Sequence, residues 1–207
     1  MGWNKPWPAL LLITFTLLGC KQAPTNLSAY KNWFASTENG YVKTRQVGQL
    51  EYKVMYTPAE YLVSNNLSDQ QVYTQDALEA QLAAYSTGRN FILQVGFNTP
   101  EPAAGEALIA AQAASYEQYA ERIQNLAFKL KERAKLVAGG DTCAPTIYHY
   151  ERGFELAKRQ TFLFSFPAPT ASSEFTFIFD DPLFETGLNK FHFGALAPIP
   201  PLPINYQ

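Results

Sequence analysis

Residues 161–179 have the sequence TFLFSFPAPTASSEFTFIF, which places phenylalanine at every second position of two short runs. Side chains of a β-strand point alternately to the two faces of its sheet, so the phenylalanines of each run share one face. Pro167-Ala168-Pro169 separates the runs and is typical of a turn. The stretch predicts antiparallel strands whose aromatic face lies on a hydrophobic layer.

The same alternation recurs elsewhere in the chain and predicts further strands over 51–56, 91–97, 147–150 and 191–193. Two polar stretches are expected to be turns. Asn39-Gly40 tolerates positive φ angles, and Asp180-Asp181-Pro182 follows the second phenylalanine run.

Helical spacing predicts two helices between the strands. Ser68 and Gln71 have the spacing of a capping box and predict a helix over 69–86. From 105 to 138 apolar residues recur at steps of four and three, with alanine at every second position of this seam, which predicts one long amphipathic helix. An intermolecular coiled coil is an alternative, but the alanines would bury little area per turn. The favoured fold is a single α+β domain with an aromatic-rich antiparallel sheet. A sandwich-like arrangement of its strands is one form of this prediction.

The first residues are typical of a cleaved signal. Residues 1–19 contain Lys5 and then a short apolar run that is too short to span a bilayer of about 30 Å. Leu17-Leu18-Gly19-Cys20 resembles the lipobox of bacterial lipoproteins. This resemblance implies cleavage before Cys20 and acylation of its sulfur; the alternative is an ordinary secretory signal.

The remaining boundaries follow from composition. Residues 20–29 are expected to form a lipid-anchored flexible leash, 30–197 a single domain, and 198–207 an extended proline-rich tail. The apolar residues of that tail favour packing against the domain over a role as a proline-motif ligand.

Composition and the residue after the lipobox cysteine bear on location and partners. Lys21 stands where an aspartate would resemble an inner-membrane retention signal, so the resemblance implies the outer membrane, facing the periplasm, with surface exposure left open. Sixteen Lys and Arg against eighteen Asp and Glu give a net charge of −2 without a strongly basic block. We therefore expect a membrane partner through the anchor and an envelope protein partner, and no nucleic acid.

Few residues are candidates for chemistry. With Cys20 acylated, Cys143 has no intramolecular thiol partner, and an enzyme would pair it with His149 or His192 and an acid such as Asp141. A structural thiol is the favoured interpretation, because no known nucleophile motif surrounds Cys143. A metal site of Cys143, His149 and His192 lacks the usual ligand spacing. We expect no cofactor and no catalytic residue.

Several short features together resemble a family of uncharacterised lipoproteins of bacteroidete-type bacteria. They are Trp33, Asn39-Gly40, Tyr56-x-Pro58 with Tyr61, the strand Phe91–Phe97 before a helical stretch, Glu151-Arg152 with Phe154, and Phe191-x-Phe193 with Ile199-Pro200. The resemblance covers most of residues 30–203 and implies location and architecture only.

The lipobox, the aromatic strands and the candidate residues are compatible with three functions. The first is a lipid-anchored envelope protein with a non-catalytic scaffold, assembly or binding role. The second is a carrier whose aromatic-rich interior holds an apolar ligand. The third, less favoured, is a periplasmic enzyme that uses Cys143 with His149.

Overall fold

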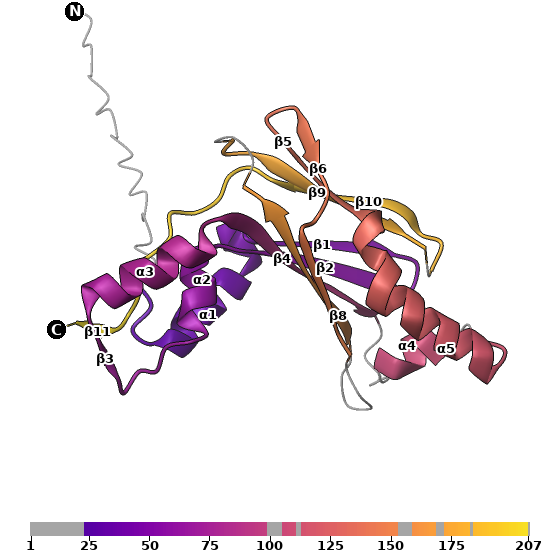
Figure 1. Cartoon of the computed structure of the whole chain (residues 1–207), viewed down its shortest axis with the longest axis horizontal. Helices are drawn as coiled ribbons and strands as arrows, with labels where there is room; N and C mark the ends of the chain where they lie inside the picture. The colour runs from indigo at the N-terminus through magenta and orange to yellow at the C-terminus, as the bar shows by residue number, and fades with distance from the viewer. Residues whose placement is uncertain are drawn as a thin grey trace, which may run out of the picture.

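Two antiparallel sheets form the body of the molecule in the computed structural model, which describes residues 23–98, 105–110, 113–152, 159–168, 172–182 and 184–206. The first sheet has the order β1-β2-β4-β8-β7, with bounds Val42–Val47, Leu50–Thr57, Gly88–Phe97, Arg159–Pro167 and Ile147–Glu151. The second has the order β10-β9-β5-β6, with bounds Gly187–Phe193, Phe175–Asp181, Ala134–Ala138 and Asp141–Cys143. The sheets stack face to face (Figure 1).

Phenylalanines from both sheets fill the space between them. Phe177 of β9 is fully buried, and its ring centroid lies 5.2 Å from that of Phe91 and 5.5 Å from that of Phe164, both in the first sheet. Edge-to-face and tilted ring pairs of this kind stabilise a core beyond the area that they bury. The strands therefore form a sandwich of two sheets, which is one form of the fold predicted from the sequence.

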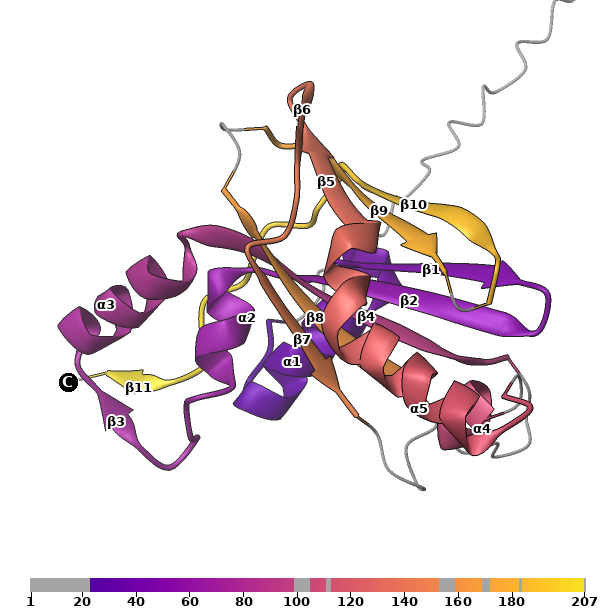
Figure 2. The ribbon, with the colours of Figure 1, turned by 45° about the vertical axis from the view of Figure 1, so that its right-hand side comes forward.

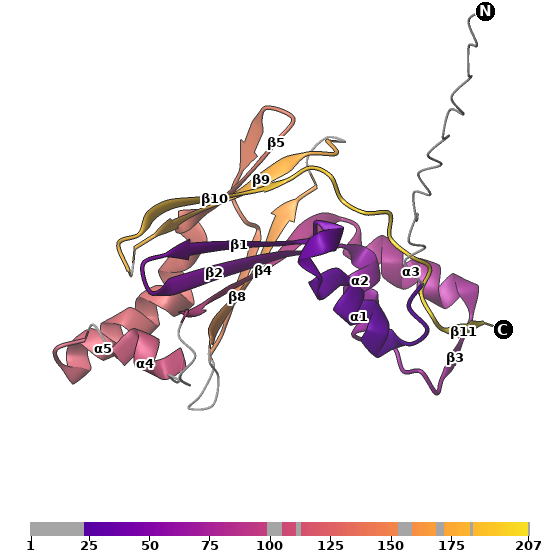
Figure 3. The same ribbon diagram turned by 180° about the vertical axis from the view of Figure 1, so that it is seen from behind.

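Helices lie at both ends of this sandwich. The structure has α1 (Leu27–Ala35), the short 3-10 helix η1 (Thr37–Asn39), α2 (Ala59–Ser64) and α3 (Gln75–Tyr85) before β4, and α4 (Gly105–Ala110) and α5 (Tyr116–Gln124) after it. Figures 1 and 3 show α1–α3 at one end and α4 and α5 at the other. The single α+β domain expected from the sequence is confirmed. In the described part of the chain, no helix combines the length and the hydropathy that crossing a membrane requires.

The predicted helix over 105–138 is wrong in its extent. α5 continues into the π-helix η2 (Asn125–Lys129) and the 3-10 helix η3 (Leu130–Arg133), after which the chain becomes strand β5. Ala134, an alanine of the predicted helical seam, pairs with Phe179 in the sheet instead, and Ala138 pairs with Phe175. Small side chains leave room for these phenylalanines in the core.

The predicted helix over 69–86 begins later, because Asp69 and Gln70 lie in a turn and Val72–Tyr73 form a strand. β3 (Val72–Tyr73) pairs in parallel with β11 (Asn205–Tyr206) of the tail, as Figure 2 shows. α3 then starts at Gln75, where the Thr74 hydroxyl accepts a hydrogen bond from the Ala77 amide at 3.4 Å. The pairing with the tail, which is distant in sequence, overrides the local helix signal.

The leash is shorter than expected, and the tail is laid against the domain. α1 already begins at Leu27, which is buried and whose amide donates to the Asp69 carboxylate at 2.9 Å. At the other end, the hydroxyl of Tyr30 donates to the Pro200 carbonyl at 3.2 Å, and that of Tyr41 to the Ala197 carbonyl at 2.9 Å. The signal segment, the lipobox and Cys20 lie outside the described residues.

Candidate functional site

A groove opens on the outer face of the first sheet, which is the face directed away from the second sheet. Strand register places its floor in two cross-strand rows. Ile147, Ser165 and Asn90 form one row, and His149, Leu163 and Ile92 form the next. Figure 2 shows α2 and α3 at the end of the sheet where β4 begins, and these helices form the wall. We call this cavity the outer groove.

The outer groove is sized and lined for an uncharged, apolar molecule. Its volume is about 460 Å³, which falls in the range of small-molecule sites. The wall contributes Tyr61 and Leu62 from α2 and Ala84 and Tyr85 from α3. Among the described residues that line the groove, none is aspartate, glutamate, lysine or arginine. A charged ligand would therefore lose its hydration without gaining a counter-charge.

The mouth of the groove lies where its floor ends at the edge strand β7, and apolar side chains are exposed to solvent there and on the wall. Ile147 is 65% exposed and Tyr85 is 37% exposed. Covering such surface would stabilise a complex by about 25 cal/mol per Å². Asn90 and His149 also face the groove, and their side chains make no hydrogen bond to another described residue. Both can therefore donate to or accept from a polar group of a ligand.

The structure does not bring Cys143 and His149 together. His149 lies on the outer face of the first sheet, because its neighbours Tyr148 and Tyr150 pack against the core on the opposite face. Cys143, on β6 of the second sheet, packs against the core between the sheets, with its sulfur 3.7 Å from the Leu136 carbonyl oxygen. Burial raises the pKa of the Cys143 thiol, which disfavours the nucleophilic thiolate.

The third candidate ligand, His192, lies on yet another surface. It points outward from β10, with its Nδ1 3.3 Å from the Thr176 hydroxyl. Cys143, His149 and His192 thus occupy the core and the outer faces of two different sheets. In the described ranges, no group of three or more His, Cys, Asp or Glu side chains is placed to hold a metal ion.

The outer groove was not predicted from the sequence, although a signal for it exists. Phe91-Ile92-Leu93 and Phe162-Leu163-Phe164 are three apolar residues in a row, which a strand buried on one face does not need. In each triplet the first and third residues point into the core, and the middle residue lies on the groove floor.

Asp180 and Asp181, expected in a turn, are instead the last residues of β9, and Asp181 is buried.

Comparison with known proteins assigns neither a family nor a function to this chain. No family model matches the sequence, and no curated protein matches it. Among solved structures, the chain is similar to the crystal structure of a DUF4426 family protein from Pseudomonas aeruginosa PAO1. The two share 8% sequence identity with a TM-score of 0.37, over 74% of this chain and 91% of that chain.

Proposed function

We propose that this chain is a lipid-anchored envelope protein with a non-catalytic binding role, whose outer groove holds the apolar part of a neutral ligand. The observation that carries the proposal is the groove itself: about 460 Å³, with no charged side chain among the described lining residues. It favours a binding or carrier role over a pure scaffold. The carrier site proposed here is a groove on the sheet surface, since the aromatic interior is filled by its own side chains.

The chemistry of the floor suggests how such a ligand would be oriented. Leu163 and Ile92 would contact its hydrocarbon on the floor, with Ile147 at the exposed β7 edge of the floor and Tyr85 on the wall. Asn90 and His149 would bind one neutral polar group, such as a hydroxyl or an ester carbonyl. A single acyl chain with an uncharged head fits this arrangement.

Acylation of Cys20 would hold the groove close to a source of such ligands. Residues 21–26 separate Cys20 from the start of α1, and even when fully extended they span only about 20 Å. We place the protein at the outer membrane on its periplasmic side, with surface exposure as the alternative. An envelope protein partner would deliver or receive the ligand.

Replacing Cys20 with serine is expected to abolish membrane attachment. Stable anchoring needs more than one acyl chain, and the lipobox cysteine is the residue that would carry the first of them. Cells are fed radiolabelled palmitate and fractionated. The wild-type chain should be labelled and found with membranes, and the Cys20→Ser chain unlabelled. An unlabelled wild-type chain in the soluble fraction would contradict the anchor.

Replacing Ile147 with aspartate is expected to weaken binding of a neutral apolar probe about tenfold or more. The new carboxylate at the mouth would lose water when the groove fills, which costs on the order of 1–3 kcal/mol. Binding is measured by titrating purified protein with N-phenyl-1-naphthylamine and following its fluorescence.

Leu188→Asp is the matched control for Ile147→Asp. Leu188 is also an exposed aliphatic residue, 51% exposed, but it lies on β10 of the second sheet, away from the groove. Its substitution should leave probe binding unchanged. Equal losses in both variants, or no probe binding by the wild-type protein, would rule out the outer groove as the ligand site.

A further inference from the structure

A second surface, at the junction of α5 and β5, has a different character from the outer groove. At its centre is Phe128, which is 78% exposed, while Leu126 and Leu130 on either side of it are buried. The two leucines fix the chain to the core and leave the Phe128 ring in solvent. Phe128 lies in the π-helix η2, and π-turns occur frequently at functional sites. No described residue covers this ring, which is therefore available to a binding partner.

Cations follow the exposed ring in the sequence. Lys129, Arg133 and Lys135 are exposed, and Lys131 is half-buried with its ammonium donating to the Thr146 carbonyl at 3.0 Å. We define the basic corner as Phe128 together with these four residues and Lys190, which is described next.

Strand register extends the basic corner onto the outer face of the second sheet. Lys135 pairs with Ile178, and Ile178 pairs with Lys190, so two lysines flank one aliphatic side chain in a row. Leu188, exposed, adds an apolar side chain next to this row, on the same face of β10 as Lys190. The surface therefore mixes cations with aliphatic and aromatic groups.

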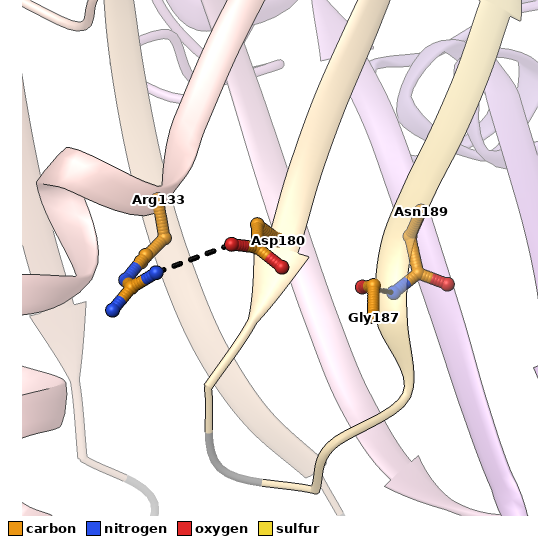
Figure 4. A network of polar contacts seen from close by, with 4 residues as sticks. All are labelled: Arg133, Asp180, Gly187 and Asn189. Atoms are coloured by element: carbon orange, nitrogen blue, oxygen red, sulfur yellow. Dashed lines mark hydrogen bonds and ion pairs between the residues drawn. The ribbon is translucent and has the colours of Figure 1, made fainter.

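Carboxylates offset this charge only in part. Asp180 forms an ion pair with Arg133 at 3.2 Å, which Figure 4 shows with the guanidinium directed at the carboxylate. Glu132 is the one acid within the segment 128–135, whose sequence is FKLKERAK. Five cations thus face two carboxylates. The other end of the molecule, where α1–α3 lie, is acidic instead (Figure 1). Its segments 23–39 and 58–87 contain one lysine and five carboxylates.

We propose that the basic corner docks on an anionic bilayer surface, with Phe128 inserted between headgroups and the lysines on their phosphates. Exposed aromatic and aliphatic side chains that alternate with Lys and Arg match the boundary between headgroups and acyl chains. Each cation near such a surface strengthens the contact severalfold. The inference rests on the proposed Cys20 anchor only for keeping the body within reach of the membrane. Docking would lay the outer face of the second sheet on the bilayer and turn the outer groove, on the opposite face of the sandwich, toward a partner protein.

The test uses the acylated chain, with a nitrobenzoxadiazole fluorophore on Gln124→Cys in a Cys143→Ala background. Gln124 is exposed and lies one helical turn before Phe128. The protein is bound to vesicles of phosphatidylcholine alone or mixed with phosphatidylglycerol, and quenching by a nitroxide-labelled lipid is measured. We expect quenching with phosphatidylglycerol only, lost in high salt. The same label on Asp76→Cys of exposed α3 should stay unquenched.

Charge variants test the surface itself. Lys129→Gln with Lys135→Gln should lower the ratio of docked to undocked protein about 30-fold, whereas Lys31→Gln with Lys53→Gln, the same charge loss elsewhere, should leave it unchanged. Phe128→Ala should lower it without changing its salt dependence. Equal quenching on both vesicle types, none on either, or binding to heparin without a vesicle response would overturn the proposal. If Cys20 were not acylated, the protein would not float with phosphatidylcholine vesicles at all. Failure of the anchor is therefore distinguishable from failure of the basic corner.

Discussion

Replacing Phe177 with alanine is expected to lower the free energy of unfolding by about 3–5 kcal/mol, measured by urea denaturation. Phe177 is fully buried, and its ring lies 5.2 Å from that of Phe91, 5.9 Å from that of Phe166 and 6.3 Å from that of Phe191. The substitution leaves a cavity between the two sheets, where neither sheet can collapse to fill it. Most domains are stable by only about 5–15 kcal/mol, so a large part of the native stability would be lost.

Phe128→Ala is the matched control for this prediction. It removes the same side chain from a position that is 78% exposed, and it should change the free energy of unfolding by no more than about 0.5 kcal/mol. A loss below about 1 kcal/mol for Phe177→Ala, or equal losses for both substitutions, would mean that the phenylalanine layer does not hold the sheets together.

The phenylalanine strands were predictable because alternation is a local signal. Phe175, Phe177 and Phe179 of β9 all point into the core, as their spacing in the sequence requires. The segment 134–138 shows the limit of this reasoning. Its residues fit a helical seam and a strand equally well, and only the phenylalanines of β9, distant in sequence, decide between them. Its inclusion in a helix was wrong for that reason.

The outer groove depends on contacts that no local pattern contains. Its floor joins three strands, β4, β8 and β7, and its wall comes from α2 and α3. His149 was singled out in the sequence for its chemistry, but the partner suggested for it, Cys143, lies on the other side of the first sheet. Which polar residue faces a cavity follows from strand order, and strand order cannot be derived from the spacing of residues within one strand.

Replacing Asp181 with alanine is expected to lower the free energy of unfolding by about 3 kcal/mol, again by urea denaturation. Its buried carboxylate accepts hydrogen bonds from the Tyr52 hydroxyl, from the Thr186 hydroxyl at 3.1 Å and from the Phe184 amide at 3.2 Å. Removal of the carboxylate leaves several buried donors without this acceptor, and each unmade bond costs about 1–3 kcal/mol.

The adjacent Asp180 provides the control, because it differs from Asp181 in burial and not in chemistry. The Asp180 side chain is 46% exposed, and its Arg133 partner is 51% exposed, so solvent screens the ion pair between them. Asp180→Ala should therefore cost at most about 1 kcal/mol. If the two alanine variants were equally stable, the carboxylate of Asp181 would be reachable by water, and the pair would be the surface turn that the sequence suggested. A large difference between them would instead fix the end of β9 as part of the core, since only a position facing Tyr52 of the first sheet makes these bonds.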